Sequence, residues 1–274
     1  MSTPPPTWKR LARGLLPPLL AQAIERRVRR GTHYAGDYGS WADARRDSTG
    51  YDAPLILERA LAATRAVRDG EAAWERDTVR FAQPEYHWPV LSGLLRAAAA
   101  EGGRLNVLDF GGAFGSTWWQ HRAWFAGLAE VRWSVVEQAA FVRAGQREFT
   151  AGPLRFYETL EACCAAEQPT TLVLSGVLPY LETPHAFLAE VARRNFRHVL
   201  IDRAGFTHDG RDLLTVQQVP PEIYPASYPC WFLDRGRVAA AFARDYRLVA
   251  EWDNEDRVNL PASFRGCLLE RTAP

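Results

Sequence analysis

The chain has 274 residues, of which 47% are hydrophobic and 24% charged, and its formal net charge at pH 7 is +1. This composition is close to the average of soluble globular proteins and excludes collagen-like, coiled-coil and disordered chains. A net charge near zero gives no global field that would attract nucleic acid or an acidic substrate. The length fits one large domain, or one domain with an appendage.

The cysteines indicate neither a disulfide framework nor structural zinc. Cys163 and Cys164 are adjacent, Cys230 and Cys267 stand apart, and no C-x-x-C pair is present. Thiols with this spacing are typical of small core residues in a reducing compartment. We therefore expect a cytoplasmic protein with no metal site.

The amino-terminal segment 8–30 is strongly basic, with seven Lys or Arg residues against Glu25, a local charge of +6. Its apolar stretch, residues 15–20, is too short for a membrane span and contains two prolines, and arginines follow it, which disfavours a signal peptide. Two interpretations stay open. The segment either packs on the body with its arginines in water, or lies on an anionic membrane surface as a peripheral contact.

Periodicity predicts a helical region before residue 103. Residues 1–7 form a tail and residues 31–50 a loop, and helical spacing predicts helices over 54–66, 71–81 and 89–100. From residue 105 short apolar strands alternate with helices of about ten residues, a pattern typical of βαβ units and a parallel sheet. The strands are expected at 105–109, 131–137, 154–157, 172–175 and 198–202, and the helices at 116–128, 139–148 and 184–195.

The alternation breaks at residues 206–232, which are rich in Pro and aromatic residues and predict a loop. A helix is expected at 235–242, followed by strands at 247–252 and 264–270. Because only a short link joins these last two strands, they predict an antiparallel hairpin at the edge of the sheet.

The most informative motif follows the first predicted strand, where Asp109, Gly111 and Gly115 form D-x-G-x-x-x-G before a helix. Glycines let the backbone approach a ligand, and the helix start offers free N–H groups. The dinucleotide pattern G-x-G-x-x-G is not met, which disfavours an NAD-dependent oxidoreductase. An acid just before the first glycine would repel a pyrophosphate and suits a ligand with a cationic amino group.

S-adenosylmethionine is such a ligand, and its ribose needs an acidic hydrogen-bond acceptor at the end of the second strand. Glu137 stands there, 22 residues after Gly115. The logic is that of the acid that binds a ribose hydroxyl in dinucleotide folds.

With these residues in place, the chain resembles the class I (Rossmann-like) S-adenosylmethionine-dependent methyltransferases. More narrowly, it is similar to a bacterial group of methyltransferases associated with polysaccharide and lipopolysaccharide biosynthesis. The resemblance covers roughly residues 33–270. The matching segments are Gly36–Trp41, Gly50–Asp52, Gly70–Asp77, Val107–Gly115, Val135–Gln138, Ile201–Arg203 and Pro221–Phe232. One departure is Ala113, where such enzymes often carry a third glycine, and we expect it to keep a negative φ.

The resemblance implies a seven-stranded, mostly parallel sheet of order 3-2-1-4-5-7-6, with strand 7 antiparallel and helices on both faces. It divides the chain into a basic segment (1–32), a helical extension (33–103) and the methyltransferase core (104–274). Ligands of such sheets bind at the carboxyl ends of the strands. The cofactor contacts that it implies are Asp109, Phe110, Gly111, Gly112, Ala113 and Gly115 in the turn, Glu137 at the ribose, Glu158 and Thr159 near the adenine, Ser175 and Gly176 near the methionine portion, and Arg76 at its carboxylate.

For the chemistry itself, Asp202 is the first candidate base, with a structural cap as its alternative role. Arg203 could pair with Asp202 or hold an acidic group of the substrate. His185 and His208 are rival bases, and the other histidines are expected to be structural or surface residues. Tyr224, Tyr228 and Trp231 are candidates for an acceptor pocket, or else fill a local core.

The expected function is methyl transfer from S-adenosylmethionine, without a metal, to an oxygen of a glycan or a lipid-linked sugar, at the inner face of the membrane if the basic segment binds there. The sugar is implied only by the resemblance. Two alternatives stay open: a small-molecule or natural-product O- or N-methyltransferase, and a non-catalytic methyltransferase-like partner in a membrane-associated assembly.

Overall fold

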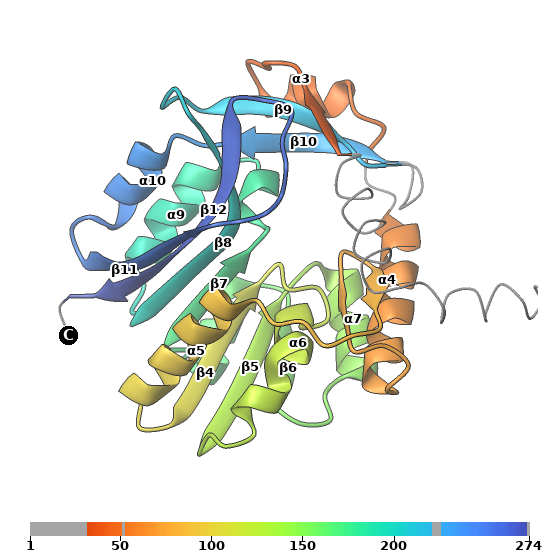
Figure 1. Cartoon of the computed structure of the whole chain (residues 1–274), viewed down its shortest axis with the longest axis vertical. Helices are drawn as coiled ribbons and strands as arrows, with labels where there is room; N and C mark the ends of the chain where they lie inside the picture. Colours follow the sequence, from red (N-terminus) through yellow and green to blue (C-terminus); the bar gives the residue numbers. More distant parts are fainter. Residues whose placement is uncertain (1–31, 51–52, 221–225, 273–274) are drawn as a thin grey trace, which may run out of the picture.

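A seven-stranded sheet forms the centre of the molecule in the computed structural model, which describes residues 32–50, 53–220 and 226–272 (Figure 1). The order β11-β12-β8-β7-β4-β5-β6 confirms the predicted order, and β12 runs antiparallel to both of its neighbours. The strands are β4 (Arg104–Phe110), β5 (Glu130–Val136), β6 (Leu154–Tyr157), β7 (Thr171–Ser175), β8 (His198–Thr207), β11 (Tyr246–Asp253) and β12 (Ala262–Arg271).

Helices cover both faces of this sheet, because successive residues of each buried strand point to opposite sides. On β4, Val107 joins the core of one face and Leu108 that of the other. The first face carries α4 (Ala53–Arg68), α5 (Trp88–Ala100), α6 (Ser116–Phe125) and α7 (Ala139–Glu148). The second carries α8 (Leu160–Glu167), the short η1 (Leu178–Tyr180), α9 (Pro184–Ala192) and α10 (Arg235–Phe242). None of the helices in the described ranges is long and apolar enough to cross a membrane.

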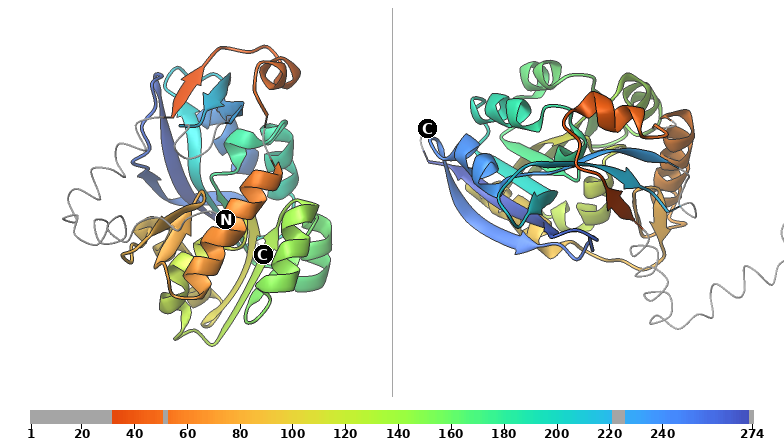
Figure 2. Two further views of the ribbon diagram at one scale, coloured as in Figure 1. Left: turned by 90° about the vertical axis from the view of Figure 1, so that its right-hand side faces the viewer. Right: turned by 90° about the horizontal axis from the view of Figure 1, so that it is seen from above.

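A second, three-stranded sheet corrects the loops predicted at 31–50 and 206–232. Its order is β1 (His33–Ala35), β9 (Leu213–Gln218) and β10 (Ser227–Phe232), all antiparallel, and α3 (Trp41–Arg46) packs on it. Pro229 fits this sheet because β10 is an edge strand, where a missing N–H costs no hydrogen bond. Figures 1 and 2 show this sheet above the ends of β7 and β8, so that it covers the carboxyl edge of the central sheet.

A β-hairpin replaces the helix predicted over 71–81, and that prediction is therefore wrong. The hairpin pairs β2 (Trp74–Arg76) with β3 (Val79–Phe81). The rings of Trp74 and Phe81 stack across it, with centroids 3.9 Å apart. The two turn residues, Asp77 and Thr78, both have positive φ, as a type I′ turn requires, but neither is the glycine that usually marks such a turn.

Candidate functional site

The glycine turn after β4 has the tight backbone that its sequence predicts. Gly111 and Gly115 have φ values of +72° and +84°, in the left-handed region. A Cβ at Gly111 would lie 2.6 Å from the Val177 side chain, and one at Gly115 would lie 2.8 Å from Leu154. No larger residue fits these two positions without a shift. The turn passes directly into α6, so the helix start faces the carboxyl edge of the sheet.

Asp109 lies beneath this turn. Its side chain is 1% exposed and accepts a hydrogen bond from Nε1 of Trp133 at 3.1 Å, while a Cβ at Gly112 would meet its carboxyl group at 2.4 Å. Burial raises the pKa of Asp109 to about 7, against the hydrogen bond from Trp133, and Glu137 adds to the rise. Asp109 is thus a buried support for the turn, held by Trp133 and covered by Gly112.

Ala113 corrects an expectation, because its φ is +51° and not negative. In this conformation the Ala113 backbone donates a hydrogen bond to the carboxylate of Glu137, which also accepts the N–H of Gln138 at 2.8 Å. Burial raises the pKa of Glu137, and both backbone hydrogen bonds oppose the rise. The turn and the end of β5 therefore hold one half-buried carboxylate between them.

The other predicted cofactor contacts at strand ends differ in how far the protein itself already contacts their side chains. Phe110 packs against Phe187, with ring centroids 4.6 Å apart. Glu158 is exposed, whereas the Thr159 hydroxyl caps α8 by accepting the N–H of Ala162 at 3.1 Å. One acceptor position of the Thr159 hydroxyl is thus used by the start of α8, and its O–H donor is not.

At the end of β7, Ser175 and Gly176 meet Asp202 of β8. The Ser175 hydroxyl donates to Oδ2 of Asp202 at 3.0 Å, and the N–H of Gly176 donates to its backbone oxygen at 2.9 Å. Register confirms the juxtaposition, since Ser175 pairs with Asp202 in the parallel ladder. The structure thus brings the predicted residues of β7 and β8 into one cluster beside the glycine turn, which follows the next strand of the sheet.

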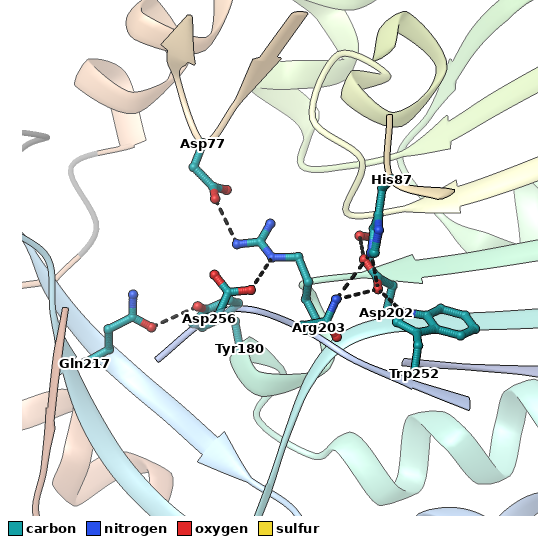
Figure 3. Close-up of polar contacts among 10 residues, drawn as sticks. Asp77, His87, Tyr180, Asp202, Arg203, Gln217, Trp252 and Asp256 are labelled. Carbon is teal, nitrogen blue, oxygen red and sulfur yellow. Dashed lines mark hydrogen bonds and ion pairs between the residues drawn. The ribbon is translucent and has the colours of Figure 1, made fainter. Parts of the chain in front are cut away.

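Asp202 is the centre of that cluster (Figure 3). Its Oδ1 atom lies 2.9 Å from Nε2 of His87, and it accepts Nε1–H of Trp252 at 2.8 Å and Nδ2–H of Asn254 at 3.0 Å. Burial alone would raise the pKa of Asp202, but the hydrogen bond and the charge interaction with His87, together with the hydrogen bonds from Asn254 and Trp252, outweigh burial and lower the pKa to about 2. A buried, ionised carboxylate that already accepts four hydrogen bonds is a weak proton acceptor, so the geometry favours a positioning role.

His87 was expected to be a structural or surface residue, and no sequence signal links it to Asp202, 115 positions away. It lies just before α5, where its backbone N–H donates to Nε2 of His121 at 3.1 Å. His121 is buried, and burial lowers its pKa to about 4. Its Nδ1 faces the carbonyl oxygen of Thr117 at 2.8 Å, so the neutral ring donates from Nδ1 and accepts at Nε2.

Arg203, the residue after Asp202, joins three segments of the chain. Its Nη2 atom lies 3.0 Å from Asp77 at the hairpin tip, and its Nε lies 3.7 Å from Asp256 in the link between β11 and β12. Burial would lower the pKa of Arg203, but the two carboxylates raise it. Arg203 also has a φ of +52°, a strained conformation for a residue with a side chain.

The hairpin reaches the glycine turn through Glu75, a residue that the sequence did not single out for a role of its own. Glu75 is buried and accepts a hydrogen bond from the hydroxyl of Ser116, the first residue of α6. The guanidinium group of Arg76, predicted to hold a carboxylate, lies 5.3 Å from the ring centroid of Trp74. The amino-terminal extension is thus part of the site.

The two acceptor candidates that the structure describes do not come together. Tyr228 packs edge-on against Tyr180, 5.4 Å away, and both hydroxyls contact Gln217. Trp231 stacks instead on Trp41, 6.5 Å away. Alternation along β10 explains the split, since residues three positions apart on a strand face opposite sides. The third candidate, Tyr224, lies outside the described residues.

The rival bases have other surroundings. His185 contacts Asp212, at 3.0 Å from Nε2 to both carboxylate oxygens, and Asp212 also binds Arg237 of α10. His208 is exposed in the turn between β8 and β9. Within the described ranges, no group of three or more His, Cys, Asp or Glu residues is placed to hold a metal ion.

Among known proteins, this chain is similar to several solved structures. No protein-family model matches the chain. No curated protein matches it either. The amino-terminal domain of EvdMO1, solved in the presence of S-adenosylhomocysteine and D-fucose, is 17% identical, with coverage of 81% of this chain and 98% of that one and a TM-score of 0.46.

Two further structures are similar at the same level. Magnesium protoporphyrin IX methyltransferase (ChlM) from Synechocystis PCC 6803, with bound S-adenosylmethionine, is 13% identical (81% and 92% covered, TM-score 0.46). The N-methyltransferase NodS from Bradyrhizobium japonicum WM9, with S-adenosylhomocysteine, is 16% identical (80% and 98% covered, TM-score 0.44). The strand order of the central sheet itself, 3-2-1-4-5-7-6 with an antiparallel seventh strand, is that of the Rossmann-like methyltransferase fold.

Proposed function

We propose that this chain is an S-adenosylmethionine-dependent methyltransferase. The observation that carries the proposal is the joint arrangement of the glycine turn and Glu137, because the backbone of Ala113 in the turn binds the carboxylate at the end of β5. Two backbone donors leave part of the acceptor capacity of a carboxylate unused. Glu137 can therefore accept hydrogen bonds from the two ribose hydroxyls.

The residues present fit this cofactor in other respects. Gly111 and Gly115 keep the turn tight against the sheet, because a Cβ at either position would collide with Val177 or Leu154. Glu158 and Thr159 would lie toward the adenine, Ser175 and Gly176 toward the methionine portion, and Arg76 toward its carboxylate. When bound, the cofactor supplies an electrophilic methyl group on a positively charged sulfur.

The charges around the cluster support a cationic ligand. Asp202 is ionised at neutral pH, because its pKa is about 2. The two negative charges of Asp77 and Asp256 outnumber the one positive charge of Arg203, which lies between them. Carboxylates that line a partly desolvated site favour a sulfonium over a phosphate. This excess of negative charge and the absence of the G-x-G-x-x-G pattern both argue against a dinucleotide with its pyrophosphate.

For the acceptor, we propose an oxygen of a glycan or a lipid-linked sugar. Tyr180 lies near Arg203 (Figure 3), and its ring packs edge-on against that of Tyr228. Rings with polar tips beside an arginine suit stacking on a sugar that carries an acidic group. A small-molecule or natural-product acceptor would use the same cofactor site. An acceptor screen that starts with nucleotide sugars and glycans and then adds phenols and amines separates the two.

Calorimetric titration of the full chain with S-adenosylmethionine, S-adenosylhomocysteine and NAD tests the proposal. We expect micromolar binding of the first two ligands and none of NAD. Failure of all three to bind would contradict a methyltransferase and leave a non-catalytic partner with this fold.

A further inference from the structure

We propose that His87 is the proton acceptor of the reaction and that Asp202 positions it, so that the acceptor substrate carries a hydroxyl group. This inference rests on the proposed methyl transfer and adds to it the residue that removes the proton. The pair was not expected, because Asp202 was the predicted base and His87 a structural or surface residue.

The hydrogen bonds fix the tautomer of the ring. Asp202 is ionised and can only accept, and its Oδ1 lies 2.9 Å from Nε2 of His87. Nε2 must therefore carry the hydrogen, and Nδ1 of the neutral ring carries the free electron pair. Nδ2 of Asn254 also lies 3.3 Å from Nε2, but it donates to Oδ1 of Asp202 at 3.0 Å, and the contact of Nε2 with Oδ1 is the shorter one at 2.9 Å.

The ring is held from two sides. Asp202 anchors its imidazole to β8, and the ring of Trp252 packs edge-on against it, with centroids 6.4 Å apart. The backbone of His87 is anchored to α6 by His121. Because α6 begins at the glycine turn and β8 pairs with β7, the imidazole is fixed relative to both halves of the predicted cofactor site.

Exposure distinguishes the two partners. The His87 side chain is 26% exposed, whereas Asp202 is 1% exposed. The imidazole is therefore open to a substrate, whereas the carboxylate is buried and already accepts from four protein donors. This division of roles, a reachable base and a buried carboxylate that orients it, is a general arrangement for proton transfer.

The step balances in atoms and electrons. The acceptor hydroxyl gives its proton to Nδ1 of His87, and an electron pair of the hydroxyl oxygen forms the new bond to the methyl carbon. The pair of the broken carbon–sulfur bond stays on sulfur. His87 becomes an imidazolium beside the ionised Asp202 and then returns its proton to water. An amine acceptor that is already neutral would need no such base before the transfer.

The experiment reads the ring directly, in the full chain labelled with ¹⁵N at histidine. Long-range ¹H–¹⁵N spectra distinguish hydrogen on Nδ1 from hydrogen on Nε2, and H87Q identifies the His87 signals. We expect an Nε2–H tautomer. Addition of S-adenosylmethionine should shift the Nδ1 signal of His87 more than S-adenosylhomocysteine does, because only the former carries the positive methylsulfonium group. The signals of exposed His33 should stay unchanged.

The outcomes separate the inference from the proposed function. An Nδ1–H tautomer overturns the inference, and so does calorimetric binding of S-adenosylmethionine that leaves the His87 signals unchanged. Absence of any binding contradicts the proposed function itself. Methylation of any hydroxyl probe that the wild type accepts should fall about 100-fold in H87Q, at unchanged cofactor affinity. H33Q, the matched control, should keep full activity, and added imidazole should restore part of the rate in H87G.

Discussion

Asp77, at the tip of the β2–β3 hairpin, accepts a hydrogen bond from Nη2 of Arg203 at 3.0 Å across 126 positions of sequence. The bond links the amino-terminal extension to the strand that carries Asp202 (Figure 3). Two strained residues make it, since Asp77 and Arg203 both have positive φ. Strain of this kind persists where the surrounding structure holds it, and it is frequent at functional sites.

The first prediction concerns D77N. Because Asp77 is 64% exposed, loss of its charge should lower the free energy of unfolding by less than about 1 kcal/mol. The hairpin should nevertheless open more often, so its amides should exchange hydrogen faster. Native-state hydrogen exchange measures this, with D256N as the matched control that removes the other partner of Arg203 away from the hairpin. Equal exchange in D77N and the wild type would contradict a tethering role for Asp77.

The second prediction concerns Ala113. Glycine adopts a φ of +51° without strain, so A113G should raise the free energy of unfolding by about 1 kcal/mol. Q168G is the matched comparison, because Gln168 ends α8 with a φ of +48° away from the glycine turn. Urea unfolding measures both. A less stable A113G would mean that the methyl group of Ala113 contributes packing that outweighs the strain.

The sequence predicts the central sheet well because its inner strands bury both faces and appear as short apolar runs between helices. The ranges Ala139–Glu148, Leu154–Tyr157 and Arg235–Phe242 match the observed elements residue for residue. The hairpin was missed because Asp77 and Thr78 form a turn that normally carries glycine. Local pattern fails where the backbone is strained.

The residues of the candidate site likewise fall into those that a local motif predicts and those that only the folded chain brings together. Gly111, Gly115 and Glu137 stand in consecutive βα units, so the spacing of a local motif places them together. His87 and Asp202 meet only because α5 and β8 pack on each other, and nothing in either local sequence encodes that contact. A histidine before one helix and an aspartate after a buried strand become a pair only in the folded chain.

The third prediction is a pH effect through Glu75. Burial raises its pKa from 4.5 to about 7, against the hydrogen bond from Ser116. As the pH rises from about 4.5 to 7, the unfolded chain releases this proton while the folded chain keeps it, so the wild type loses stability across that window. E75Q cannot ionise. Its stability relative to the wild type should therefore increase from pH 4.5 to 7 and then level off.

Urea unfolding at several pH values measures that difference. Asp109, whose pKa is also about 7, contributes equally to both proteins and cancels. E58Q, on the exposed side of α4, is the control and should show a constant difference. A constant difference for E75Q as well would mean that Glu75 ionises alike in the folded and unfolded chains.

The fourth prediction concerns residues 1–30, which lie outside the described residues. Their charge predicts attraction to anionic lipid, since residues 8–30 carry +6. Deletion of residues 1–30 should leave S-adenosylmethionine binding intact and reduce sedimentation with phosphatidylserine vesicles. Phosphatidylcholine vesicles are the uncharged control. Equal sedimentation of both forms with phosphatidylserine would exclude this segment as a membrane contact.

The last prediction concerns Glu137. If its carboxylate accepts the ribose hydroxyls, E137A should weaken S-adenosylmethionine binding by about 1–3 kcal/mol, the scale of a hydrogen bond to a charged group. S-adenosylhomocysteine has the same ribose and should lose the same amount, which calorimetry can check. E158A, which removes an exposed carboxylate at the end of the next strand, should lose less. Unchanged affinity in E137A would remove Glu137 from the ribose. A loss confined to S-adenosylmethionine would indicate that Glu137 acts through the sulfonium charge and not through the ribose.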